Sequence, residues 1–152
     1  MASRFPLQVL LDHARHRLEA AERLLRMLRR KEDEARGRLA ELKGYREEYQ
    51  ARLAGQGQAG MSIRQIQDYH AFLGNLEAAV SQQEGELDRA GLRWRQAHDE
   101  WGQLRQRVKA YETLAKRHVE EESRREERRD QRQTDEVAAA RGHVEAWLNG
   151  PK

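Results

Sequence analysis

Apolar residues recur with a seven-residue period in a first long stretch of the chain. Alternating steps of four and three residues from Leu7 reach Leu53, and only Glu32 and Arg46 among these fourteen positions are polar. The positions are Leu7, Leu11, Ala14, Leu18, Ala21, Leu25, Leu28, Glu32, Ala35, Leu39, Leu42, Arg46, Tyr49 and Leu53. A strict heptad repeat predicts a helix that supercoils against a partner along this seam.

A second seam has the same period. It begins at Ile66, and only Gln83 and His118 among its sixteen positions are neither apolar nor aromatic. The positions are Ile66, Tyr69, Leu73, Leu76, Val80, Gln83, Leu87, Ala90, Trp94, Ala97, Trp101, Leu104, Val108, Tyr111, Ala115 and His118. Two seams on one chain predict two helices that pack against each other.

The segment between the seams is rich in glycine. Residues 54–61 include Gly55, Gly57 and Gly60, and glycine readily adopts the positive φ that ends a helix and reverses the chain. We therefore expect a first helix over about residues 5–53, a tip loop over 54–61 and a second helix from residue 62. A short loop makes the two helices antiparallel neighbours.

The start of the second helix carries its own signals. Ser62 and Gln65 have the spacing of a capping box, and Met61 can pack on Ile66 as a hydrophobic staple.

Polar residues within the seams suggest a register. One antiparallel pairing places Glu32 opposite Gln83 and Arg46 opposite Tyr69, so that the polar positions of the first seam meet polar partners. Buried polar layers of this kind fix the register of a coiled coil at some cost in stability.

The heptad pattern ends after His118. Residues 119–152 carry interleaved acids and bases and predict a helical, fraying tail that awaits a partner. The expected fold is therefore all-α: a single domain over residues 1–152, consisting of a long antiparallel two-helix coiled coil with a C-terminal helical extension.

Composition narrows the function classes. Lys and Arg number 29 against 26 Asp and Glu, and their interleaving is typical of solvated helix surfaces, so we expect no nucleic-acid partner. The chain has no cysteine and no apolar run near the ~20 residues that span a bilayer. These features favour a soluble, cytoplasmic protein without a targeting segment.

Candidate chemistry is sparse. His13 and His16 have a spacing that can bind a metal, but no carboxylate or cysteine set completes a site. The sequence contains no glycine-rich phosphate loop and no nucleophile elbow. We therefore expect no catalytic, cofactor-binding or metal-binding residues, and we expect that the chain is not an enzyme. Trp94 and Trp101 lie on the seam and are interpreted as core residues, with an aromatic binding box as the alternative.

One apolar stripe lies beside the second seam. Phe72, Leu76, Ala79 and Gln83 follow the spacing i, i+4, i+7, i+11, which places them on one helix face. A two-helix coiled coil buries only a narrow face, so part of this stripe is expected at the surface. The stripe is either a docking site for a partner or a cover for the flank of the seam. Its exposed apolar surface also predicts weak self-association.

Five motifs follow one another along the chain: FPLQVLLDHA, AAERLLRMLRR, LKGYREEYQARL, GMSIRQIQDYHAFLGNLEAAVSQQE and ETLAKRHVEEESRREERRDQRQTDE. In these motifs, and over nearly its whole length, the chain resembles the family of the flagellar type III export protein FliJ. The resemblance implies a stalk-like antiparallel coiled coil, similar to the γ subunit of rotary ATPases, that sits in the ring of the export ATPase FliI and promotes its assembly and activity. It also implies contacts with the export-gate protein FlhA and with export chaperones, at the cytoplasmic face of the inner membrane.

The resemblance assigns residues to two partners. For the export gate it implies Phe72, Leu76, Ala79 and Gln83, the stripe that spacing also singles out. For the ATPase ring, analogy with the rotary stalk implies the end where the termini lie: Phe5, Leu7, Leu11 and the helix from Leu114 onward. Two other classes stay open. One is a cytoplasmic export chaperone or escort, and the other is a structural or nucleic-acid-associated coiled coil.

Overall fold

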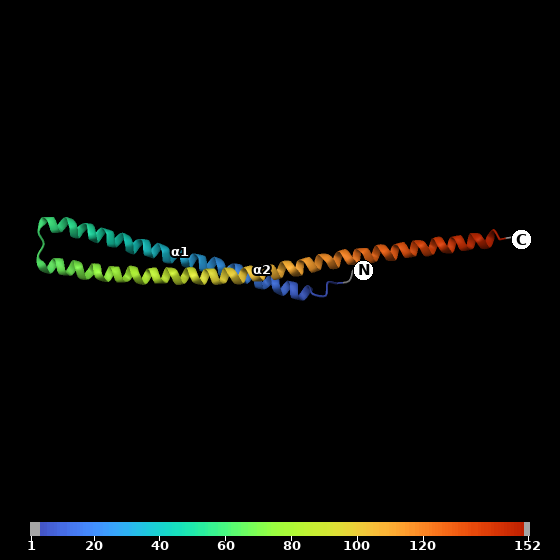
Figure 1. The fold of residues 1–152 in the computed structure, drawn as a ribbon, viewed down its shortest axis with the longest axis horizontal. Coiled ribbons are helices and arrows are strands. Elements are labelled where there is room, and N and C mark those ends of the chain that lie inside the picture. Colours follow the sequence, from blue (N-terminus) through green and yellow to red (C-terminus); the bar gives the residue numbers. More distant parts are fainter. Residues whose placement is uncertain (1–3, 151–152) are drawn as a thin grey trace. The chain divides into compact units, whose positions relative to one another are not determined.

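The computed structural model describes residues 4–150 and contains two helices. Helix α1 covers Gln8–Ala59 and helix α2 covers Ile63–Leu148. Figure 1 shows them in chain order, and residues 4–150 contain no β-strand. The all-α helical hairpin predicted from the two seams is thereby confirmed. The chain divides into two compact units, one made of residues 17–104 and the other of residues 1–16 and 105–152.

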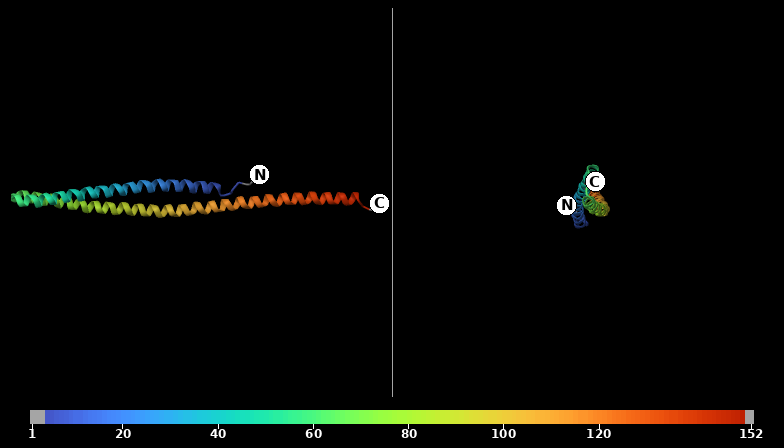
Figure 2. Two further views of the ribbon diagram at one scale, coloured as in Figure 1. Left: turned by 90° about the horizontal axis from the view of Figure 1, so that it is seen from above. Right: turned by 90° about the vertical axis from the view of Figure 1, so that its left-hand side faces the viewer.

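In the unit of residues 17–104, α1 and α2 run antiparallel and side by side (Figures 1 and 2). The most deeply buried apolar side chains of this unit are all seam residues: Ala35, Leu39, Leu73, Val80, Ala90 and Ala97. Every other seam position here is half-buried. Burial of a leucine side chain contributes about 1.5–3 kcal/mol, so the seam provides the main stabilisation of the pair.

The chain reverses later than its glycines suggest. α1 continues through Gly55 and Gly57 to Ala59, and Gly60 is the glycine with a positive φ, at 88°. The expected end of the first helix at residue 53 and the tip loop over 54–61 are therefore corrected to a turn over residues 60–62. The segment AGQGQA contains no proline, the residue that most strongly breaks a helix, and its two glycines oppose the helix by only about 1 kcal/mol each.

The predicted capping box is confirmed. The backbone N–H of Gln65 donates to the Ser62 hydroxyl oxygen at 3.2 Å, and the backbone N–H of Ser62 donates to Oε1 of Gln65 at 3.1 Å. These bonds satisfy N–H groups that have no partner within the helix, and they fix the start of α2 immediately after the turn.

The proposed register is wrong by three residues of α1. Gln83 contacts Ala35 instead of Glu32, and the ring of Tyr69 lies 6.2 Å from that of Tyr49 instead of beside Arg46. The turn lies later in the sequence, at residues 60–62 instead of 54–61, and this changes which residues of α1 face α2. Glu32 instead bonds to Arg29 and Arg36 of its own helix, at 3.4 and 3.1 Å.

In the other unit, the first turns of α1 pack on the later part of α2. Leu11 and Ala14 are buried here together with Val108. The Phe5 ring lies 5.7 Å from the His118 ring, and Nη2 of Arg15 lies 3.4 Å from Oε1 of Glu112. His118 is half-buried, as expected of a layer near the end of a seam.

The seam of α2 extends one position further than its apolar residues predict. Glu122 follows His118 by the heptad step of four, is only 7% exposed, and bonds to Arg125 at 3.2 Å. From residue 123 to residue 150 every side chain is exposed, although α2 remains helical to Leu148. The predicted helical tail is therefore present, and residues 151 and 152 lie outside the described part of the chain. None of the helices, within the described residues, is long and apolar enough to cross a membrane.

Candidate docking surfaces

An aromatic patch surrounds Phe72 in the unit of residues 17–104. The Phe72 ring lies 4.3 Å from that of Tyr49 at an interplanar angle of 36°, and its side chain is 42% exposed. Tyr45 is also exposed and precedes Tyr49 by four residues, which places both on one face of α1. We define the aromatic patch as Tyr45, Tyr49, Phe72, Leu76 and Ala79.

Sequence reasoning missed the α1 half of this patch. Tyr49 was assigned to the seam alone, and its contact with Phe72 depends on a register that the sequence did not yield. An available signal was the pair of tyrosines four residues apart at Tyr45 and Tyr49, immediately before the turn.

The rest of the predicted stripe is less accessible than Phe72. Leu76 and Ala79 are half-buried, so they form the inner edge of the patch. Gln83 is also half-buried, and its Nε2 donates to the backbone carbonyl of Ala35 at 3.2 Å. This bond directs the Gln83 side chain across the helix pair rather than outward.

The four residues assigned to the ATPase ring lie in the unit of residues 1–16 and 105–152. Phe5 and Leu7 are half-buried, Leu114 is 41% exposed and Leu11 is only 2% exposed. Leu11 therefore presents almost no surface to a partner. Leu114 offers the largest exposed fraction of the four.

The helical tail carries its own exposed apolar residues. They are Val137, Val144, Trp147 and Leu148, spaced by seven, three and one residues, so they follow one side of α2. Nothing in the described residues covers them.

Both seam tryptophans pack between the helices, as predicted. Trp101 donates from Nε1 to Oε1 of Glu22 at 3.5 Å, and the guanidinium of Arg29 lies 4.1 Å from the centre of the Trp94 ring. The exposed His98 lies between them, and the centre of its ring is 5.0 Å from that of Trp94 and 5.3 Å from that of Trp101. Each indole is thus engaged by neighbours in its own unit, which supports a structural role.

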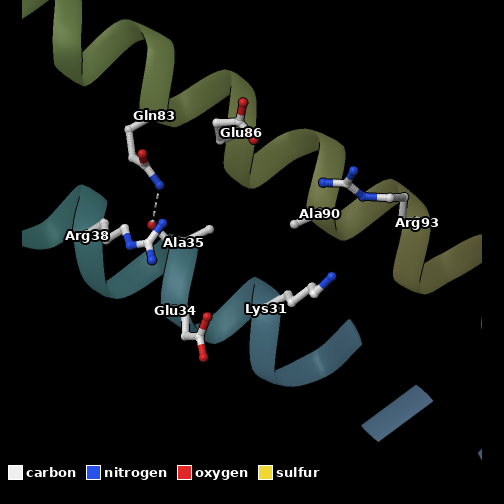
Figure 3. A pocket seen from close by; sticks show the side chains of 8 residues that line it. All are labelled: Lys31, Glu34, Ala35, Arg38, Gln83, Glu86, Ala90 and Arg93. Atoms are coloured by element: carbon white, nitrogen blue, oxygen red, sulfur yellow. Dashed lines mark hydrogen bonds between the residues drawn. The ribbon is translucent and has the colours of Figure 1, made fainter. Parts of the chain in front are cut away.

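A cavity of about 280 Å³ opens between the helices where the seam carries small residues. Figure 3 shows Ala35 and Ala90 from opposite helices, with the Gln83 amide directed at the Ala35 carbonyl. The remaining lining residues are of both charges: Lys31, Glu34, Arg38, Glu86 and Arg93. The cavity is a gap left by two alanines, and its lining provides no pair of groups poised for acid–base chemistry.

One carboxyl group that lines this cavity, that of Glu86, has a shifted pKa. A hydrogen bond from Arg89, at 2.8 Å, and the positive charge of the same guanidinium hold the pKa of the Glu86 carboxyl below its usual value. The contact with Arg89 therefore favours the charged form of Glu86. Within residues 4–150, no cluster of three or more His, Cys, Asp or Glu side chains is arranged to hold a metal ion.

Comparisons with known proteins match nearly the whole chain. The family model of the flagellar FliJ protein matches residues 3–146. The flagellar FliJ protein of Escherichia coli (strain K12) is 32% identical over 138 residues, which cover 91% of this chain and 94% of that protein. The flagellar FliJ protein of Salmonella typhi is 31% identical over 142 residues, with the same shares of the two chains covered. No solved structure matches. The chain thus belongs to the FliJ family of flagellar export proteins.

Proposed function

We propose that this chain is a non-enzymatic, stalk-like component of the flagellar type III export apparatus. It binds the ring of the export ATPase FliI, promotes the assembly and activity of that ring, and links it to the export-gate protein FlhA. Membership of the FliJ family supports the place in the apparatus, and the observation that carries the linking role is that each of the two compact units has an exposed apolar surface of its own.

The proposed gate contact is the aromatic patch. Phe72 remains exposed although its neighbour Leu73 is buried in the seam, so the ring is available to a partner without disturbing the pair. Aromatic side chains with a rigid backing are frequent anchors of protein interfaces, and the ring of Tyr49 backs Phe72 on one side. Gln83 belongs to the proposed contact through its position, because its bond to Ala35 holds the adjacent turn of α2 in place.

The proposed ring contact lies in the unit that contains both ends of the chain. Phe5, Leu7 and Leu114 provide its accessible apolar surface, and Leu11 supports it from the buried seam. The tail of α2 beyond Glu122 adds a helix with all its sides exposed. A helix of this kind is suited to insertion into the opening of a ring, where the ring would cover it.

The proposed location follows from the partners. The chain acts in the cytoplasm, peripherally at the cytoplasmic face of the inner membrane, and reaches the membrane only through the gate. Export chaperones are further proposed partners, and the exposed patch also permits weak self-association.

Two assays with purified proteins test this function. The chain is added to its cognate FliI, and ATP hydrolysis and ring assembly are measured by phosphate release and electron microscopy. We expect both to increase. Absence of both effects would contradict the proposal. Binding of export substrates or chaperones without any effect on the ATPase would instead support an escort, and salt-dependent binding of DNA or RNA would support a nucleic-acid role.

A further inference from the structure

One stretch of α1 departs from the interleaved charge of the chain. Residues 23–31, RLLRMLRRK, contain five cationic side chains and no carboxylate. The stretch LRWRQAH over residues 92–98 of α2 adds two arginines, again without an acid. The chain as a whole has 29 basic and 26 acidic residues, so this is a local concentration of positive charge.

The two stretches meet at a groove in the unit of residues 17–104. The groove has a volume of about 610 Å³ and is lined by Leu25, Arg26, Arg29, Arg30 and Trp94. Leu25 and Trp94 are half-buried and form its apolar floor, whereas the three arginines are exposed. We call it the arginine groove.

The arginines of this groove differ in their partners. Arg29 lies over the Trp94 ring at 4.1 Å and is 3.4 Å from Oε2 of Glu32. Within residues 4–150, Arg26 and Arg30 form no ion pair, in contrast to Arg36 and Arg89, which bond to carboxylates on their own helices. Two guanidinium groups therefore stand beside an apolar floor without an acidic partner.

We propose that the arginine groove docks an acidic, amphipathic helix of a partner protein. Apolar side chains of that helix pack on Leu25 and Trp94, and its carboxylates bond to Arg26 and Arg30. Guanidinium groups bind carboxylates through two parallel hydrogen bonds, which gives such a contact direction as well as charge. A helix that presents apolar residues on one face and acids at its edge matches both features of the groove.

The shape of the groove is better suited to binding a helix than to binding an anionic membrane surface. A bilayer surface would meet the outward side chains of α1, such as Leu24 and Met27, and not a half-buried floor between two helices. The inference does not depend on the proposed function, because the arginine groove shares no residue with the aromatic patch or the proposed ring contact.

The experiment uses the full chain and a defined probe. The probe is a fluorescein-labelled helical peptide of glutamate, leucine and alanine, with leucine at i, i+3, i+4 and i+7. An isomer with the same composition in scrambled order is the control peptide. Binding is measured by fluorescence anisotropy for the wild-type chain, for R26Q/R30Q, and for R128Q/R129Q, which loses the same charge in the exposed tail.

We expect saturable binding of the amphipathic peptide, weakened about fivefold or more in R26Q/R30Q, as expected for two lost charge-assisted contacts. R128Q/R129Q should bind as the wild type does, and the scrambled peptide should bind less well. In a W101F/W147F background, Trp94 is the remaining tryptophan, and its emission should shift when the peptide binds. Circular dichroism checks that each variant retains its helices.

Four results would overturn the proposal. They are no binding, an equal loss in both double variants, equal binding of the scrambled peptide, and an unchanged Trp94 emission at saturation. Co-sedimentation with vesicles of phosphatidylglycerol and phosphatidylcholine forms a separate arm. Vesicle binding that R26Q/R30Q abolishes, together with no peptide binding, would assign the groove to a membrane surface.

Discussion

The side-chain amide of Gln83 donates a hydrogen bond across the helix pair to the backbone carbonyl of Ala35, at 3.2 Å. Both residues are seam positions, so the bond fixes which turn of α2 faces which turn of α1. A polar residue within an apolar seam commonly serves to set the register of a coiled coil.

Replacement of Gln83 by alanine should therefore destabilise the pair. We expect Gln83→Ala to lower the free energy of unfolding by about 1 kcal/mol, the usual net contribution of one hydrogen bond. Urea unfolding followed by circular dichroism measures the change. The neighbouring Gln82 is exposed, so Gln82→Ala is the matched control, and an equal loss in both variants would remove the role assigned to Gln83.

The glycines near the turn should respond to alanine in opposite directions. Gly60 has φ 88°, a conformation that costs an L-residue roughly 1–2 kcal/mol, so Gly60→Ala should lower the free energy of unfolding. Gly55 lies within α1 and has open space around it, so Gly55→Ala should raise that free energy by up to about 1 kcal/mol. Thermal unfolding of the two variants provides the comparison. A turn over residues 54–61 would instead make Gly55→Ala destabilising.

Glu86 should titrate below the usual range of a glutamate because Arg89 donates a hydrogen bond to its carboxylate. A lowered pKa in the folded state stabilises the fold above the pKa of the unfolded chain, and this stabilisation is lost as the pH falls through the folded-state pKa. Carbon-13 NMR of the Glu86 carboxyl follows the titration. Arg89→Gln should move the midpoint upward, whereas the same change at the exposed Arg95 should leave it in place, and an unmoved midpoint in Arg89→Gln would refute the assigned cause.

Phe72→Asp should abolish binding to the export gate while the helices remain intact. A charge in place of the exposed ring removes the proposed anchor, but Phe72 contributes little to the seam. Pull-down with the cytoplasmic part of FlhA measures binding, and circular dichroism measures helicity. Leu92 is 49% exposed on the same helix, so Leu92→Asp controls for the added charge. Gate binding that survives Phe72→Asp would argue for a shielding role of the stripe.

The sequence predicted the packed face of each helix because residues at the heptad spacing lie on the same face of a helix. It did not predict the register. Register depends on where the chain reverses, and Gly55 and Gly57 are helical here although glycine also permits a turn. The error of three residues followed from that one boundary.

The candidate surfaces were predicted only in part, for related reasons. Spacing placed Phe72 and Gln83 on one stripe, yet it could not tell that Gln83 bonds across the seam, because that depends on the residue opposite. The contact between Tyr49 and Phe72 was missed for the same reason. Glu122 was missed because a charged residue is not expected at a seam position, although the heptad step of four from His118 leads to it.

The most direct measurement concerns the link between ATPase and gate. Stimulation of FliI and binding of FlhA are measured in parallel for the wild-type chain, Phe72→Asp and Leu114→Asp, with helicity checked in each. We predict that the wild type does both, that Phe72→Asp stimulates the ATPase without binding the gate, and that Leu114→Asp binds the gate without full stimulation. A wild-type chain that leaves the ATPase unchanged, or two variants that each lose both activities while folded, would contradict a link made by separate surfaces.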